Sequence, residues 1–220
     1  VTDSSNNLRA VAGCATASIT PFDSITWPKT VVIDFGTVNC TGSDGNNRRG
    51  IITAVFSGPY LDSGTVITVS LSNYYHNDYK ITGTQTITNQ GNNSAGHLVY
   101  KVVVSGATVT NPSTGNSSSW STTQYREFYA GYTTSFYIFD DVYLITGNAS
   151  GVSEAGEAYT INITLPLRVN IGCPWIVSGT FTLLLNDYPT YPINFDYGTG
   201  TCDANATATL NGTTYNIVMN

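Results

Sequence analysis

The sequence predicts an all-β protein with an antiparallel β-sandwich-like architecture and an internal duplication of a strand-plus-disulfide unit. Three observations lead to this prediction. Several short runs alternate apolar and polar residues with period two, as half-buried strands do, for example residues 64–72 and 159–165. Clusters of Gly, Asn and Pro separate these runs and supply turns. No window of useful length shows the periodicity of an amphipathic helix.

The first half of the chain predicts strands joined by polar turns. TGSDGNNRRG, residues 41–50, contains an Asp-Gly pair and predicts a polar loop or hairpin tip. NPSTGNSSS, residues 111–119, is the most loop-like stretch and fits either a hairpin tip or a domain boundary. The predicted strands of this half are residues 14–20, 31–35, 51–57, 64–72, 79–88 and 97–104.

The clearest turn in the second half is Asn211-Gly212, which lies between ATATL and TTYNIVM and predicts a type I′ hairpin. The other predicted strands of this half are residues 119–128, 134–145, 159–165, 175–185 and 191–197. We therefore expect an N-terminal arm over residues 1–13 and a single elongated β domain over residues 14–220. A division of that domain into two halves, residues 14–110 and 120–220, is the alternative.

One motif occurs twice. VVIDFGTVNC, residues 31–40, and NFDYGTGTC, residues 194–202, share an Asp, an aromatic residue, Gly and Thr, followed by a cysteine. The two acids, Asp34 and Asp196, can be metal ligands or catalytic acids, and a glycosidase needs such a pair at a defined separation. Because they occupy duplicated positions before a Gly, we favour a role in fixing a turn through backbone amides.

The four cysteines follow the same duplication. Four cysteines allow three pairings, and buried free thiols in a reducing cytosol are the alternative to disulfides. The duplication selects Cys14 with Cys40 and Cys173 with Cys202. Each disulfide closes a loop of about 27 to 30 residues, which stabilises the fold by about 3 to 4 kcal/mol in the chain-entropy model.

Composition restricts the compartment and the partners. Only 10% of the residues are charged, against roughly 25% in ordinary soluble domains, and the net charge is −6. With no basic patch we expect no nucleic-acid partner, and with no long apolar run we expect a chain that does not span a membrane. VTDSSNNLRAVAG at the start is not a signal peptide, so we expect a mature, secreted chain at the cell surface, which suits disulfides.

Candidate binding residues are few. Tyr74, Tyr75 and His76 in NYYHNDY can form a platform that stacks on a sugar ring, although Tyr-rich strands more often pack on their neighbours. His97 is the only other histidine, and no nucleophile elbow accompanies either histidine. We therefore predict no catalytic residues, no enzyme activity, no cofactor and no metal site.

Residues 28–58, PKTVVIDFGTVNCTGSDGNNRRGIITAVFSG, resemble a family of uncharacterised exported proteins and lipoproteins of Bacteroidota with the pattern PKTxxIDFGxxNC. The likeness continues through CPWIVSG to FDYGTGTCDANATATLNGTTYNI. Relatives place a first Arg directly after the Asp-Gly pair, where this chain has Asn-Asn-Arg-Arg, and the chain begins at Val1 rather than at a lipid-bearing cysteine. The resemblance implies no activity. It implies O-glycosylation at Ser24, within Asp-Ser-Ile.

The sequence favours a structural extracellular protein, the subunit of a filament or adhesive, pilus-like appendage that forms a homopolymer by β-strand addition. The exchanged segments would be residues 1–13 or 213–219. The alternative is a cell-surface glycan-binding β-sandwich module, in which Trp120 or Trp175 joins the tyrosine platform.

Overall fold

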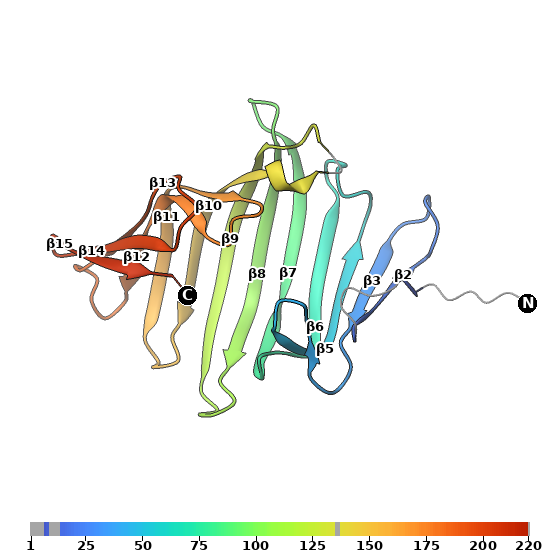
Figure 1. Ribbon diagram of the computed structural model, residues 1–220, viewed down its shortest axis with the longest axis horizontal. Coiled ribbons are helices and arrows are strands. Elements are labelled where there is room, and N and C mark those ends of the chain that lie inside the picture. The colour runs from blue at the N-terminus through green and yellow to red at the C-terminus, as the bar shows by residue number, and fades with distance from the viewer. Residues whose placement is uncertain (1–6, 9–13, 135–136, 220) are drawn as a thin grey trace, which may run out of the picture. The chain divides into compact units, whose positions relative to one another are not determined.

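A computed structural model describes residues 7–8, 14–134 and 137–219 of the chain (Figure 1). These residues form strands and one short 3-10 helix, η1 (Ile138–Asp140). The prediction of an antiparallel all-β protein is confirmed. The predicted strand over residues 134–145 is wrong in its first part, because residues 138–140 form η1 and the next strand begins only at Val142.

The strands follow one another with short connections. The first half contains β1 (Asn7–Leu8), β2 (Thr16–Thr20), β3 (Lys29–Asp34), β4 (Cys40–Thr41), β5 (Asn47–Phe56), β6 (Val66–His76), β7 (Tyr79–Asn92) and β8 (Leu98–Thr110). The second half contains β9 (Ser117–Ala130), β10 (Val142–Val152), β11 (Ala158–Asn170), β12 (Ile176–Leu185), β13 (Ile193–Thr199), β14 (Asn205–Leu210) and β15 (Thr213–Val218).

The hydrogen-bonded order of the strands is their order along the chain, except that β4 pairs with β5 beside β3. The strands thus form a meander within one sheet, whereas a sandwich divides its strands between two sheets. Period-two alternation predicted the strands correctly, but it cannot tell a second sheet from further strands of the same sheet. Residues 111–116 are the loop of the β8–β9 hairpin, closed by a hydrogen bond from the Asn111 amide to the Asn116 carbonyl.

The chain divides into two compact units, and each is described here by itself. The first comprises Val1–Asn89 and Val104–Trp120, and the second comprises Gln90–Val103 and Ser121–Asn220. The boundary crosses β7, β8 and β9 within the strands rather than falling in the loop at residues 111–116. Of the predicted arm, residues 1–13, only β1 lies within the described residues.

Buried side chains are few and mostly small. Among the described residues, the buried apolar positions are largely Ala and Val, and Val177 is the largest side chain that is completely buried. Many strand residues are half-exposed at successive positions, as in β12, although successive side chains of a strand point to opposite faces. Both faces of β12 are therefore only partly covered.

Glycines in the middle of strands allow close backbone contact. Gly179 interrupts β12 at φ +108°, and the register against β13 shifts between Ser178 and Thr180. A Cβ atom at Gly179 would lie 2.3 Å from the carbonyl oxygen of Pro166 on β11. A Cβ atom at Gly50 on β5 would likewise collide with backbone atoms of Asn73 and Tyr74 on β6. These positions are β-bulges that only glycine accommodates.

Candidate functional site

The duplicated acids have the same role in both copies. The Gly36 amide donates a hydrogen bond of 2.7 Å to Oδ1 of Asp34, and the Gly198 amide donates one of 2.8 Å to Oδ1 of Asp196. Both glycines have positive φ, +77° and +83°. Each carboxylate therefore fixes a turn through a backbone amide, which is the role that the sequence favoured for these two acids.

The disulfides join Cys14 to Cys40 and Cys173 to Cys202, which is the pairing selected by the duplication. The Cα–Cα distances are 5.6 and 5.9 Å. In each copy the first cysteine precedes a strand, β2 or β12, and the second follows the strand paired with it, β3 or β13. Each crosslink therefore fastens the corresponding end of an antiparallel strand pair.

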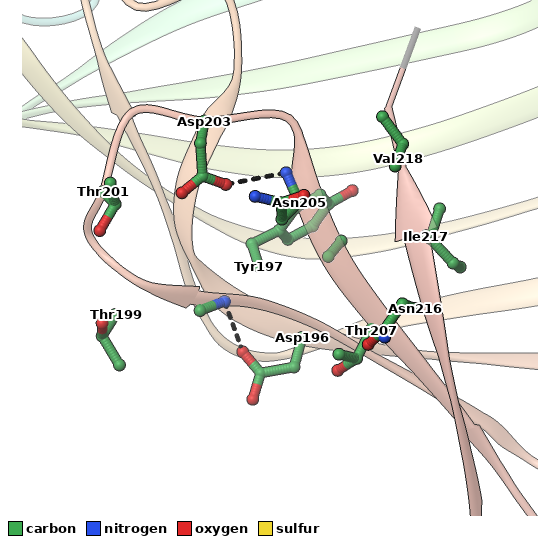
Figure 2. Close-up of a pocket in the computed structure, with 12 residues that line it drawn as sticks. Asp196, Tyr197, Thr199, Thr201, Asp203, Asn205, Thr207, Asn216, Ile217 and Val218 are labelled. Atoms are coloured by element: carbon green, nitrogen blue, oxygen red, sulfur yellow. Dashed lines mark hydrogen bonds between the residues drawn. The ribbon is translucent and has the colours of Figure 1, made fainter.

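A hollow of about 530 Å³ lies beside the second copy of the motif (Figure 2). Two carboxylates line it, Asp196 and Asp203, and each accepts a backbone amide, Asp203 from Asn205 at 2.8 Å. Burial raises the pKa of the Tyr197 phenol, which also lines the hollow. The opposite wall comes from residues 216–218 of β15. Both carboxylates are thus engaged in fixing turns. The hollow itself lies beside β15, the last strand in the order of the sheet.

The first copy of the motif borders a hollow of about 440 Å³, lined by Asp34, Gly36, Thr37, Arg49 and Tyr75 among others. The guanidinium carbon of Arg49 lies 3.8 Å from the centre of the Tyr75 ring, and the guanidinium bonds the carboxylate of Asp78. That hydrogen bond lowers the pKa of Asp78. The charge of Arg49 is thus neutralised within the protein.

Arg48 makes an equivalent set of contacts with different partners. Its guanidinium donates to both carboxylate oxygens of Asp44, at 3.1 and 2.7 Å, which lowers the pKa of Asp44 and raises that of Arg48. It also interacts with the hydroxyl of Tyr74, whose ring lies 5.9 Å from that of Phe35. The two adjacent arginines of the predicted loop therefore hold two different sets of side chains.

The candidate glycan platform is divided by this arrangement. Tyr74 and Tyr75 are neighbours in β6, so their side chains point to opposite faces of the strand. Tyr74 is buried, Tyr75 is covered by Arg49, and His76 lies on the side of Tyr74. The three residues therefore do not present one surface to a sugar ring.

Ser24 lies in the exposed loop between β2 and β3. Asp23 fixes the loop by accepting the amides of Thr26 and Ile25 at 2.6 and 2.9 Å, bonds that lower the pKa of Asp23. The ammonium of Lys29 also contacts this carboxylate, at 3.3 Å. The hydroxyl-bearing residue of the proposed modification motif thus sits in an ordered, solvent-accessible turn.

The second unit contains an aromatic and polar cluster that the sequence did not indicate. Nδ1 of His97 lies 2.6 Å from Oε1 of Glu127 on β9. The His97 ring meets Tyr129 edge-on at 5.4 Å between centroids, and Tyr132 at 5.9 Å. The guanidinium of Arg168 on β11 lies 5.9 Å from the Tyr129 ring. We call His97, Glu127, Tyr129, Tyr132 and Arg168 the His97 cluster.

The acidic, histidine and cysteine side chains of the described residues are not gathered into a candidate metal site. None of their His, Cys, Asp and Glu side chains form a group of three or more that could hold a metal ion. Within the same residues, no helix has the length and apolar character needed to cross a bilayer. The features that the described residues do form are the two Asp-fixed turns, the two disulfides, the exposed strand β15 and the His97 cluster.

Comparison with known proteins adds no assignment to these features. No protein-family model matches the chain, and neither a curated protein nor a solved structure matches it.

Proposed function

We propose that the chain is a structural protein of the cell surface that assembles with copies of itself by strand addition at β15. The main support for this proposal is the position of β15 in the sheet and its amino-acid composition. It is the last in the strand order, and among the described residues its hydrogen-bonded neighbour is β14. The two disulfides are of the kind found in proteins of oxidising compartments, which supports a place outside the cytoplasm.

The register of the last hairpin identifies the backbone groups that a new strand would meet. Leu210 and Thr213 flank the turn at Asn211-Gly212, where both residues have positive φ, as in a type I′ turn. The pair that flanks such a turn is hydrogen-bonded, and bonded and non-bonded pairs alternate from there. The Met219 amide, which bonds the Ala204 carbonyl at 2.8 Å, agrees with this alternation.

It follows that the backbone groups of β15 divide into two sets. Those of Thr213, Tyr215 and Ile217 face β14, whereas the N–H and C=O groups of residues 214, 216 and 218 face away from it. Outward-facing groups of this kind are a template for another strand. A strand from a second copy would therefore pair with residues 214, 216 and 218.

The sequence of β15 lacks the residues that usually protect a sheet edge against such pairing. Natural sheet edges carry charges, especially Lys, or Pro, or a covering segment. The stretch TTYNIVM contains neither a charged residue nor Pro. The side chains of Tyr215 and Val218 are 56% and 66% exposed. At the other end of the order, β1 already covers part of β2, opposite Ala17 and Ser18. These contrasts favour β15 as the assembling edge.

The test is the substitution Asn216→Pro. Proline removes the outward amide of residue 216 and leaves the amides of Tyr215 and Ile217 bonded to β14, so an edge strand tolerates it. We expect the wild-type protein to form oligomers or fibres as its concentration rises in sedimentation velocity and electron microscopy. Asn216→Pro should remain monomeric, and Asn216→Ala, which keeps the amide, should assemble. A wild-type chain that stays monomeric at all concentrations would overturn the proposal, as would assembly of Asn216→Pro.

A further inference from the structure

The His97 cluster combines exposed aromatic rings with polar groups that are held in place. Tyr129 and Tyr132 are 42% and 52% exposed, while the side chains of His97 and Glu127 are only 18% and 28% exposed. Every second side chain of a strand points to the same face, so Glu127 and Tyr129 lie together on one face of β9. The His97–Glu127 bond fixes the polar pair beside the two rings.

Polar atoms remain for a ligand in this cluster. Oε1 of Glu127 is the oxygen that bonds His97, so the second carboxylate oxygen can accept another hydrogen bond. Nε of Arg168 donates to Oδ1 of Asn170 at 3.0 Å, and the ion pairs of the described residues use other cations. The two terminal nitrogens of the Arg168 guanidinium thus offer donors near an exposed ring.

We propose that the His97 cluster binds a neutral carbohydrate. A pyranose ring has an apolar face, which suits an exposed tyrosine ring, and hydroxyl groups that both donate and accept hydrogen bonds. Tyr132 provides the stacking surface, because its side chain is the more exposed of the two tyrosines and Arg168 already lies beside the Tyr129 ring. Neighbouring sugar hydroxyls donate to Glu127 and accept from Arg168. The opposite charges of these two residues give the cluster no net preference for a charged sugar.

This site differs from the platform expected from Tyr74, Tyr75 and His76, and it lies within the second unit alone. It is also independent of strand addition, because none of its residues belongs to β15. A loss of carbohydrate binding and a loss of assembly are therefore separable by mutation.

The experiment is a printed array of neutral and carboxylated oligosaccharides, followed by calorimetric titration of the neutral sugar that binds most strongly. We expect binding of the wild-type chain, weakened at least fivefold by Tyr132→Ala and by Glu127→Gln. The matched control is Tyr188→Ala, which removes a tyrosine of similar exposure, 56%, from a loop elsewhere in the second unit. Thermal unfolding of each variant verifies that it folds.

Two results would overturn the proposal. One is the absence of binding to every neutral sugar on the array by the folded wild-type chain. The other is an equal affinity of Tyr132→Ala and Tyr188→Ala for the titrated sugar. Asn216→Pro should bind the sugar as tightly as the wild type does. Carbohydrate binding can therefore be measured even if the proposed strand addition is wrong.

Discussion

The substitution Gly179→Ala tests how β12 is joined to its neighbours. The new Cβ atom would lie 2.3 Å from the Pro166 oxygen and 2.7 Å from the Leu167 Cα, both backbone atoms that cannot rotate away. Positive φ costs a non-glycine residue about 1–2 kcal/mol, and forcing extra volume into a packed site costs about 1–3 kcal/mol. The lower entropy of the unfolded alanine chain offsets about 0.4–1 kcal/mol.

Together these effects give a destabilisation of about 3 kcal/mol. For a chain of this size, each kcal/mol lowers Tm by about 2–4 °C, so we expect a decrease of about 6–12 °C. Calorimetry or urea unfolding followed by tryptophan fluorescence measures the change. Trp175 lies close to the site in sequence and reports on this part of the second unit.

The control Gly156→Ala separates the clash from the backbone strain. Gly156 also has positive φ, +87°, but nothing lies within 4 Å of a Cβ atom placed there. Its substitution should therefore cost about 1 kcal/mol or less, which is the strain less the entropic gain. Equal losses of stability in the two variants would refute the reasoning that close backbone contact, rather than φ, makes Gly179 necessary.

The remaining predictions concern the crosslinks and the acidic side chains. Cys202→Ser with Cys173→Ser opens a loop of 29 residues and should lower the free energy of unfolding by about 3–4 kcal/mol in urea titrations. Unchanged stability would contradict the crosslinking role. The pKa of Asp44 is lowered in the folded protein. The ionised Asp44 side chain therefore adds to the free energy of unfolding above its unfolded pKa of about 4, and this stabilisation is lost as the pH falls below that value. Asp44→Asn should therefore reduce the loss of stability between pH 5 and pH 2 in equilibrium unfolding, and an unchanged pH profile would argue against the Arg48 pairing.

Local signals in the sequence predicted local structure well. The repeated Asp-aromatic-Gly-Thr motif indicated turns fixed at Asp34 and Asp196, and the structure has the same hydrogen bond in both. The Asn211-Gly212 pair indicated the last hairpin, because only a few residue types adopt positive φ at both turn positions. In these cases the residues that specify the structure are close together in the chain.

Apart from the two disulfides, which the duplication selected, side-chain contacts between distant residues were not predicted. His97 and Glu127 are 30 residues apart, and only the pairing of strands brings them together. Tyr74 and Tyr75 looked like one platform because they are adjacent, yet adjacency in a strand places them on opposite faces. The aromatic run before Val142 resembled a strand because Tyr and Phe favour strands, although residues 138–140 form η1.

The central claim is that β15 offers its outward backbone groups to a second copy. Hydrogen exchange of individual amides, measured on the monomeric and the assembled protein, tests it most directly. We predict that the amides of residues 214, 216 and 218 exchange readily in the monomer and become protected on assembly, while those of Tyr215 and Ile217 are protected in both states. Assemblies in which the amide of residue 216 exchanges as fast as in the monomer would contradict the claim.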